Sequence, residues 1–215
     1  MKIGIIGSGD VGQTLAKAFA NEGHETMLGT RNTSKQAIVK FKNENPEITV
    51  GTFAETAVFA ELVVLAVSGA VAEEAIATAG KNNFSNKIVI DVTNPISSDA
   101  PVNGVLHFFT SLEESLMEKI QAIIPYASVV KAFSSVGNAR MYKPDFKEGK
   151  PTMFICGNND AAKKTVTTIL TAFGWETEDM GKVEAARAIE PLCMLWCIPG
   201  FLHNQWSHAF KLLKT

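Results

Sequence analysis

The feature that most constrains this chain is a glycine-rich turn that begins at residue 7, directly after a short apolar run. Lys2–Ile6 has the composition of a buried strand, Gly7–Gly12 follows it, and apolar residues then recur at helical spacing over residues 15–20. A second strand-like run covers Glu25–Leu28. The order of strand, glycine turn, helix and strand is typical of a dinucleotide-binding unit. Glycines also occur in many ordinary loops, but this context favours the binding function.

Each glycine of the turn has its own physical task. Gly7 permits the tight turn, Gly9 lets the backbone approach a pyrophosphate, and Gly12 lets the helix pack closely on the strand. Free N–H groups at the helix start, together with the helix dipole, favour a bound phosphate. We therefore predict a cofactor-binding turn made of Gly7, Ser8, Gly9, Asp10, Val11 and Gly12.

The loop after the second strand selects the cofactor. Sites for NAD place an acidic residue about 20 positions after the glycines, where it binds the ribose hydroxyls. Here Gly29–Asn32 contains Thr30, Arg31 and Asn32 but no acid, and Lys35 follows one turn later. A guanidinium pairs with a 2′-phosphate, whereas a carboxylate would repel it. The sequence therefore predicts NADP(H), the alternative being that Arg31 is a solvated loop residue.

Composition limits the possible classes of protein. The chain has 215 residues, 46% hydrophobic content and a net charge of −2, which suits one α/β domain over 1–215 with a helical appendage at 183–214. No basic patch with interleaved aromatics predicts a nucleic-acid partner. No signal peptide or uninterrupted membrane-length apolar segment is legible, so we expect a soluble, cytoplasmic protein that does not enter a membrane.

The three cysteines lie inside apolar runs, which indicates free thiols in a reducing compartment. Cys193 and Cys197 are one helical turn apart, but no third ligand is spaced with them. Buried packing is therefore favoured over a metal site.

Strand-like and helix-like segments alternate along the rest of the chain, which predicts a doubly wound parallel sheet. The uniformly apolar run 62–67 is typical of a strand buried on both faces. Further strands are expected at 48–50, 87–92, 129–133, 152–156 and 176–179, and helices at 34–43, 52–60, 111–124 and 160–173. The simplest arrangement places the last two strands in the same sheet.

The final segment, Val183–Lys214, is predicted to be helical and interrupted near Pro191 and Pro199. From Ala185 to Leu202 it is apolar nearly all round, so it needs cover on every side. A partner subunit, a bound aromatic substrate or both would supply that cover. We therefore expect a homodimer formed through this helix.

Ligands of open α/β sheets bind beyond the carboxyl ends of the strands. The loops expected at that edge are Gly7–Gly12, Gly29–Asn32, Val67–Ala70, Thr93–Pro95 and Ser134–Gly137. No Ser-His-Asp, Lys-Tyr or metal-binding pattern is legible, so no catalytic residue is assigned. Moving a hydride between two bound rings depends on their orientation more than on an acid–base pair. The sequence weakly favours that kind of reaction.

Five motifs carry a resemblance to a known family. They are Gly7–Gly12, Gly29–Asn32, Asp91–Pro95, Val130–Phe133 and Glu190–Leu192. Together they resemble the NADPH-dependent deazaflavin reductases, which are NADP oxidoreductases dependent on coenzyme F420. The early motifs also resemble the cytosolic domain of the six-transmembrane metalloreductases, which pass a hydride from NADPH to flavin.

The resemblance implies a role for each part of the site. Ser8–Val11 would hold the pyrophosphate, and Thr30, Arg31 and Lys35 would hold the 2′-phosphate. Val67, Ser68, Asn94 and Pro95 would lie along the nicotinamide. Members of the family often carry Asn where this chain has Ser134, on the side of the acceptor.

The predicted function is an NADPH-dependent oxidoreductase that transfers a hydride between NADP(H) and a flavin-like or deazaflavin acceptor. This small-molecule ring is expected between Val67–Ala70, Asn94–Pro95 and Ser134–Gly137, with one wall from Leu192–Phe201 of either subunit. One alternative is a small hydroxyacid- or imine-reductase-like dehydrogenase, for which Lys182 and Glu184 are the candidate catalytic residues. Another is an NADPH-sensing protein without turnover.

Overall fold

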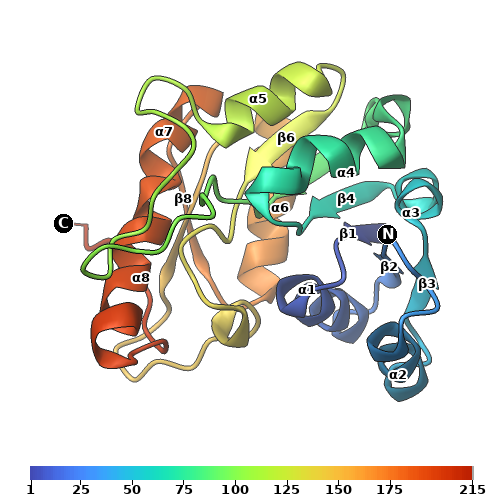
Figure 1. Cartoon of the computed structure of the whole chain (residues 1–215), viewed down its shortest axis with the longest axis horizontal. Helices are drawn as coiled ribbons and strands as arrows, with labels where there is room; N and C mark the ends of the chain where they lie inside the picture. The colour runs from blue at the N-terminus through green and yellow to red at the C-terminus, as the bar shows by residue number, and fades with distance from the viewer. Residues whose placement is uncertain (215) are drawn as a thin grey trace.

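A computed structural model describes residues 1–214, and its centre is a six-stranded parallel sheet (Figure 1). The strand order is β3-β2-β1-β4-β5-β6, which is that of doubly wound dinucleotide-binding sheets. The strands are β1 Lys2–Ile6, β2 Glu25–Gly29, β3 Thr49–Gly51, β4 Leu62–Leu65, β5 Ile88–Asp91 and β6 Ser128–Lys131. The predicted fold class is confirmed.

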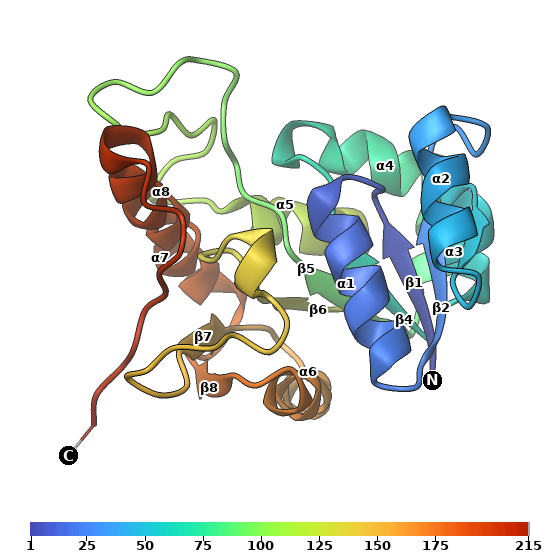
Figure 2. The same ribbon diagram turned by 90° about the horizontal axis from the view of Figure 1, so that it is seen from below.

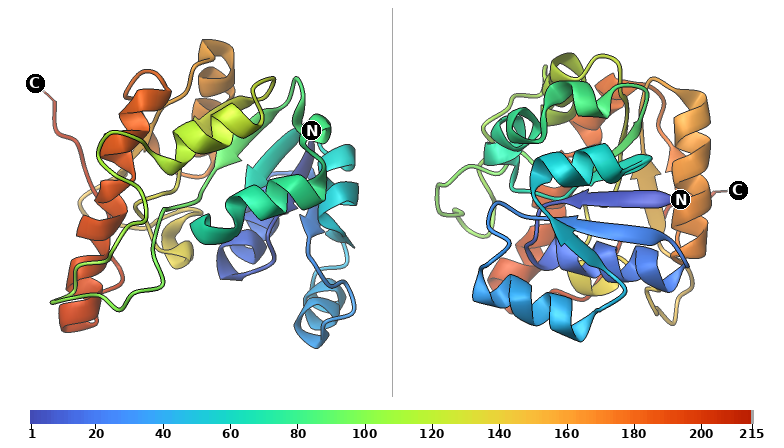
Figure 3. Two further views of the ribbon diagram at one scale, coloured as in Figure 1. Left: turned by 45° about the horizontal axis from the view of Figure 1, so that its top comes forward. Right: turned by 90° about the vertical axis from the view of Figure 1, so that its right-hand side faces the viewer.

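Helices cover both faces of this sheet (Figure 3). One core holds Phe19 of α1 (Asp10–Asn21), Phe41 of α2 (Gln36–Glu44) and Leu170 of α6 (Asp160–Ala172). The other face packs α3 (Phe53–Phe59), α4 (Ala72–Ala79) and α5 (Leu116–Ile123). All four residues of β4 are buried, as its uniformly apolar sequence indicated.

Two helices begin with reciprocal capping boxes. Thr52 and Glu55 cap α3, while Ser115 and Glu118 cap α5, so in each case a hydroxyl and a carboxylate satisfy free backbone N–H groups. The box at Ser115 starts α5 at Leu116, five residues later than the expected start at 111. Residues 1–214 also contain four short 3₁₀ turns: η1 Gly69–Val71, η2 Lys81–Phe84, η3 Asn138–Arg140 and η4 Val183–Ala185.

The expectation that the last two strands extend the main sheet is wrong. Strands β7 (Thr152–Ile155) and β8 (Glu176–Asp179) form a separate parallel pair connected by α6. This pair meets β6 through a single antiparallel bridge between Lys131 and Cys156. Strand β6 ends at that bridge, and Phe133 two residues later has a left-handed backbone (φ 61°). The edge of β6 is therefore too short for β7 to pair along it.

The C-terminal segment is helical over a shorter range than the sequence suggested. Helices α7 (Ala186–Ile189) and α8 (Pro191–His203) follow η4, and α8 continues through Pro199. Pro191 occupies the first turn of α8, where a missing N–H is tolerated. Asn204 has left-handed dihedral angles (φ 53°) that end the helix, and residues 205–214 are not helical. The first part of this stretch folds back along α8, where Trp196 Nε1 donates to the His208 carbonyl at 2.8 Å and the two rings stack. In Figure 2, the chain then continues past the helices to the C-terminus.

The expectation of no membrane-length apolar segment also needs a correction. Val183–His203 is a helical segment of 21 residues whose most apolar 18-residue window has a mean hydropathy of 1.3, so by length and composition alone it could cross a membrane. One third of its most apolar window is buried within the protein. Glu190, near its centre, is only 1% exposed and forms an ion pair with the sheet.

Candidate cofactor site

The geometry of the glycine turn after β1 fits the role that the sequence predicts for each of its glycines. Gly7 has a positive φ of 119°, and a Cβ on Gly12 would lie 1.9 Å from the Gly7 carbonyl oxygen. A side chain is therefore excluded at Gly12 by close packing and is strained at Gly7. A Cβ on Gly9 would meet no atom within 4 Å. The turn thus leaves open space at Gly9, at the start of α1, which fits the approach of a pyrophosphate.

The glycine turn is tied directly to the loop that follows β2. Gly7 N donates to the Gly29 carbonyl at 3.2 Å, and the Ser8 hydroxyl donates to Thr30 Oγ1 at 3.0 Å. Asn32 Oδ1 accepts from Ser34 N at 2.9 Å, which forms a local side-chain turn. Arg31 is exposed between these two anchored residues. The loop therefore presents its cation to solvent from a fixed backbone.

A first cavity of about 390 Å³ lies at the carboxyl ends of β1, β2 and β4. It brings together nine of the residues predicted for the cofactor: Gly7, Ser8, Gly9, Thr30, Arg31, Asn32, Lys35, Val67 and Ser68. This is the point where the strand order reverses, between β1 and β4, as expected for a doubly wound sheet.

Sequence reasoning missed the opposite wall of the first cavity. That wall consists of Phe53, Val71, Glu74, Ala75 and Thr78. Phe53 follows the end of β3, and the others follow β4 by way of η1. These residues follow strands β3 and β4, which end at the same edge of the sheet as the glycine turn. That position in the sequence could have identified them as lining residues.

A second cavity, of about 600 Å³, adjoins the first and shares Gly9, Ala66, Val67 and Ser68 with it. Its remaining wall consists of Asp10, Val11, Gly69, Ala70, Val92, Asn94, Ile96, Ser97 and Ser98. The predicted residues Asp10, Val11 and Asn94 therefore belong to this second cavity. Gly12 and Pro95 are buried behind the walls and line neither cavity.

The expected contribution of Ser134–Gly137 and Leu192–Phe201 to the cleft differs from the structure. Neither segment of the same chain lines the second cavity, and a wall from the Leu192–Phe201 segment of a second subunit stays a prediction. The Ser134 carbonyl instead accepts a hydrogen bond from Asn94 Nδ2 at 2.9 Å, so it holds a lining side chain from behind. Trp196 of α8 forms a small buried cluster with Leu106, and Ile96 packs against this cluster, so α8 supports the wall without forming it.

Asn94 carries a further indication of a ligand. Within residues 1–214, its Oδ1 is buried and has no hydrogen-bond partner, although Nδ2 is bound. Buried polar atoms are rarely left unsatisfied, so an acceptor of this kind beside a cavity is suited to a ligand N–H donor. The open space at Gly9 and the free acceptor on Asn94 are both consistent with a bound dinucleotide.

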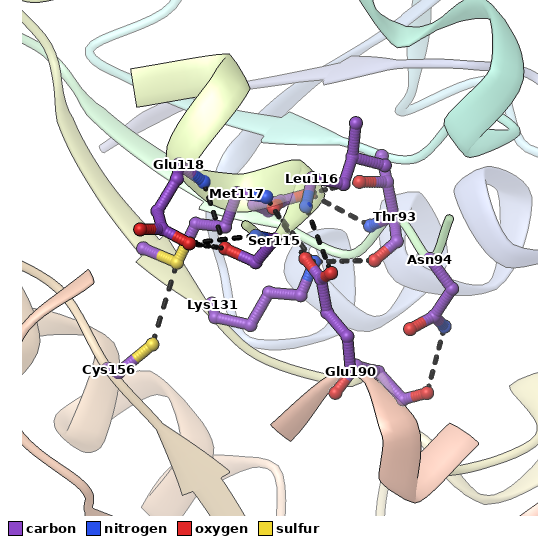
Figure 4. Close-up of polar contacts among 11 residues, drawn as sticks. Thr93, Asn94, Ser115, Leu116, Met117, Glu118, Lys131, Cys156 and Glu190 are labelled. Carbon is purple, nitrogen blue, oxygen red and sulfur yellow. Dashed lines mark hydrogen bonds and ion pairs between the residues drawn. The ribbon is translucent and has the colours of Figure 1, made fainter. Parts of the chain in front are cut away.

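A fully buried ion cluster lies behind Asn94 (Figure 4). Lys131 Nζ is 2.9 Å from Asp91 Oδ2, 2.9 Å from Glu190 Oε1 and 2.6 Å from the Thr93 carbonyl oxygen. Burial alone would lower the pKa of Lys131, but the charges of Asp91 and Glu190 outweigh it, so the pKa is raised. Lys131 therefore stays charged and is not an available proton donor.

Neither cavity contains a recognisable nucleophile or acid–base pair among residues 1–214. Cys156 is buried against Met117, and burial raises the pKa of its thiol to about 12. Cys193 and Cys197 are buried in the small core around Trp196, as their apolar context predicted. The arrangement can hold and orient ligands, and it places no side chain to attack one.

Comparison with known proteins decides the family. Residues 2–95 match the family model described as "NADP oxidoreductase coenzyme F420-dependent". A crystal structure of a protein from Arthrobacter sp. FB24, provisionally assigned as an F420-dependent NADP reductase, is 33% identical to this chain. It superposes with a TM-score of 0.93, and the match covers 100% of both chains. The chain belongs to this family. It is accordingly an NADP-dependent oxidoreductase.

This chain is also similar to parts of longer proteins. The rat Metalloreductase STEAP3 is 30% identical over 206 residues, which are 94% of this chain but 39% of the metalloreductase. The chain spans less than half the length of the curated relatives it matches. An imine reductase from Aspergillus terreus, solved with NADPH4 and dibenz[c,e]azepine, is 14% identical with a TM-score of 0.66 and shares the fold.

Proposed function

We propose that the protein transfers a hydride between NADP(H) and a flavin-like or deazaflavin ring acceptor. The observation that carries this proposal is the pair of adjoining cavities, which share Gly9, Val67 and Ser68 at the carboxyl edge of the sheet. The first cavity has two exposed cations, Arg31 and Lys35, at one side. The second has mainly apolar walls. A dinucleotide that crossed from one to the other would place its nicotinamide in the second cavity.

In this proposal each predicted residue has a defined role. Thr30, Arg31 and Lys35 bind the 2′-phosphate, since a guanidinium and an ammonium both complement its charge. The turn Ser8–Val11 binds the pyrophosphate through its backbone N–H groups. Val67, Ser68, Asn94 and Pro95 form or support the surface for the nicotinamide.

The chemistry of the second cavity suits a flat acceptor that needs little assistance. Val11, Val92 and Ile96 contribute apolar surface, and Asp10 is the one charged residue in its wall. When bound, NADPH supplies the hydride, and the protein's own residues align the two rings and exclude water. A flavin or deazaflavin takes a hydride directly and takes its proton from solvent. The lack of an acid–base pair among the described residues that line this cavity is compatible with that chemistry.

The imine- or hydroxyacid-reductase alternative needs an acid or base beside the nicotinamide. Lys182 and Glu184 were the candidates on the C-terminal segment, but both are exposed and neither lines a cavity. Lys131 is close to the turn at Thr93 and Asn94 that is proposed for the nicotinamide, but its side chain is completely buried in the ion cluster. These positions favour the ring acceptor over an imine or ketone.

Two further expectations complete the proposal. We infer that α8 forms a homodimer interface with a second copy of the chain, because Leu195, Phe201 and Leu202 are 54%, 45% and 51% exposed on one helix. We also infer a soluble, cytoplasmic protein, since Glu190 anchors the apolar C-terminal segment to the sheet through an ion pair.

The proposed function is tested by following NADPH oxidation at its absorbance band with a panel of acceptors. FMN, riboflavin and a deazaflavin represent the ring acceptors, and cyclic imines and ketoacids represent the alternative. Turnover with the ring compounds alone supports the proposal. Turnover with imines or ketoacids alone would replace it, and tight NADPH binding with no turnover would favour an NADPH sensor.

A further inference from the structure

Three sequence motifs that lie far apart in the chain meet at the buried ion cluster. Asp91 ends β5, Lys131 ends β6, and Glu190 lies between α7 and α8. Figure 4 shows Lys131 and Glu190 meeting beside Thr93, and Asp91 Oδ2 lies 2.9 Å from the same lysine nitrogen. All three residues are at most 1% exposed, so none of them can contact a ligand directly. Their effect on the site must pass through the residues that they hold.

The cluster holds Thr93 by both its side chain and its backbone. Lys131 Nζ donates to the Thr93 carbonyl at 2.6 Å. The second carboxylate oxygen of Asp91 accepts from Thr93 N at 2.9 Å and from Thr93 Oγ1 at 2.7 Å. Hydrogen bonds to charged groups are stronger than neutral ones, and here they are shielded from water. The residue before Asn94 is therefore fixed in position and orientation.

Asn94 is held from the other side by the strained end of β6. Asn94 Nδ2 donates to the Ser134 carbonyl. The residue before Ser134, Phe133, has a left-handed φ of 61°, which is unusual for a bulky residue. Strain of this kind persists only where surrounding contacts over-determine the backbone. Asn94 also packs closely on the opposite wall, since a Cβ on Gly69 would lie 2.0 Å from the Asn94 carbonyl oxygen.

Glu190 extends the same network to the C-terminal helices. Its two carboxylate oxygens accept from Leu116 N and Met117 N at 3.0 Å each, at the start of α5, while Oε1 also pairs with Lys131. The next residue, Pro191, begins α8, which packs against Ile96 of the second cavity. One lysine therefore connects both supports of the nicotinamide end, the turn at Thr93 and the start of α8.

We propose that Lys131 is a positioning residue that fixes Asn94 for the nicotinamide half of NADP(H). The proposal rests on the proposed function, because it takes the second cavity as the nicotinamide site. A buried ion cluster is weak evidence for stability, since apolar side chains of similar volume often replace one without loss. Its worth here lies in orientation: Lys131 holds the Thr93 carbonyl inward, and Asn94, which lines the second cavity, is fixed between Thr93 and the Ser134 carbonyl.

The experiment compares binding of a whole and a truncated ligand by calorimetry. NADPH occupies both cavities, whereas adenosine 2′,5′-bisphosphate carries only the half proposed for the first cavity. Lys131→Met should weaken NADPH binding about tenfold, equivalent to one hydrogen bond, and should change binding of the bisphosphate less than about twofold. Equal weakening of both ligands, or of neither, would overturn the proposal.

Two matched variants separate positioning from simple loss of stability. Lys131→Met combined with Glu190→Gln removes one positive and one negative charge, so the net charge of the cluster is unchanged. This double variant should fold better than the single one and should still show the selective loss of NADPH affinity. If restored folding also restores NADPH affinity, or if the double variant does not fold, the cluster is structural and the proposal fails.

Lys163→Met is the control for removing a buried lysine. Lys163 is 6% exposed and pairs with Asp160 at 3.1 Å and Asp179 at 2.9 Å, but it lines neither cavity. This variant should lower the melting temperature and leave both affinities unchanged; selective loss of NADPH affinity here would contradict the role of Lys131. If the unmodified protein binds neither ligand, the NADP site itself is wrong, which is a separate failure.

Discussion

The Ser8 hydroxyl donates a hydrogen bond of 3.0 Å to Thr30 Oγ1, and this contact joins the turn after β1 to the loop after β2. Thr30 is 4% exposed, whereas its neighbour Arg31 is exposed. The spacing between the open turn at Gly9 and the guanidinium is therefore set by the backbone on both sides. The two proposed phosphate-binding positions of the cofactor site are therefore held at a fixed spacing before the cofactor binds.

Arg31→Ala should weaken NADPH binding and leave NADH binding nearly unchanged. Loss of one charge-assisted hydrogen bond costs about 1.5–3 kcal/mol, which corresponds to a factor of about 10 to 150 in the dissociation constant. Within residues 1–214, Arg31 forms no ion pair, so removing it should not disturb folding. Fluorescence titration of both cofactors provides the measurement.

Lys164→Ala is the matched control, because Lys164 is an exposed cation on α6 that lines neither cavity. It should leave both affinities as they are. Equal losses for NADPH and NADH in the Arg31→Ala variant would exclude a role in binding the 2′-phosphate.

Alanine substitutions at two glycines of the same turn should affect different properties: cofactor binding at Gly9 and stability at Gly12. Gly9→Ala places its Cβ in open space with a φ of −74°, so the free energy of unfolding should fall only by the loss of a better N-cap residue, about 0.5–1 kcal/mol. NADPH binding should nevertheless be lost, because the methyl group occupies the approach of the pyrophosphate. Unchanged NADPH affinity in Gly9→Ala would show that the cofactor does not approach this turn.

Gly12→Ala should destabilise the fold instead. Its Cβ would lie 1.9 Å from the Gly7 carbonyl oxygen, so α1 and the turn must separate. The expected cost is about 3 kcal/mol, as for an overpacked core position. Thermal unfolding of the two variants measured side by side checks the contrast, and equal melting temperatures would contradict it.

Leu195→Glu should convert the proposed homodimer into a monomer. Leu195 is 54% exposed on α8, so a carboxylate there is tolerated by the single chain but would be buried in an interface. Sedimentation at micromolar concentration gives the mass. Val58→Glu, at a residue of α3 that is 66% exposed, is the control and should leave the mass unchanged. A monomeric unmodified protein would rule out this interface.

Stability should depend on pH through Glu118. Hydrogen bonds from Arg187 are the main reason that the pKa of Glu118 falls from 4.5 to about 2, with burial opposing them and Ser115 assisting. A carboxyl with a depressed pKa stabilises the fold above its unfolded pKa, and this contribution is lost as pH falls from about 4.5 to 2. The unmodified protein should therefore lose stability more steeply over that range than Glu118→Gln.

Glutamine retains the capping box with Ser115, so the comparison isolates the charge of Glu118. Urea unfolding at several pH values provides the free energies. Parallel pH profiles for the two proteins would show that the pair with Arg187 does not affect stability.

The first half of the cofactor site could be predicted because its signals are local in the sequence. Gly7 and Gly12 must be glycines for reasons of backbone geometry, and Thr30–Arg31 follows β2 directly. The parallel sheet then brings both loops to the same edge. Phe53 of the opposite wall was missed because one aromatic residue after a short strand has no distinctive pattern.

The ion cluster could not be derived from the sequence. The motifs around Asp91, Lys131 and Glu190 were visible as a family resemblance, but nothing local shows that three charges 40 or more residues apart meet in the core. The position of β7 was mispredicted for a similar reason. Its sequence is that of a strand, and the left-handed backbone at Phe133, which limits pairing with β6, depends on tertiary contacts.

The central claim is direct hydride transfer to a ring acceptor, and NADPH carrying deuterium stereospecifically at the transferred position tests it most directly. With a deazaflavin analogue that does not exchange the transferred hydrogen, mass spectrometry of the reduced acceptor should show one deuterium. The measured rate should also fall wherever hydride transfer limits it. Unlabelled reduced acceptor, or deuterium delivered only to an imine or ketone, would contradict the account.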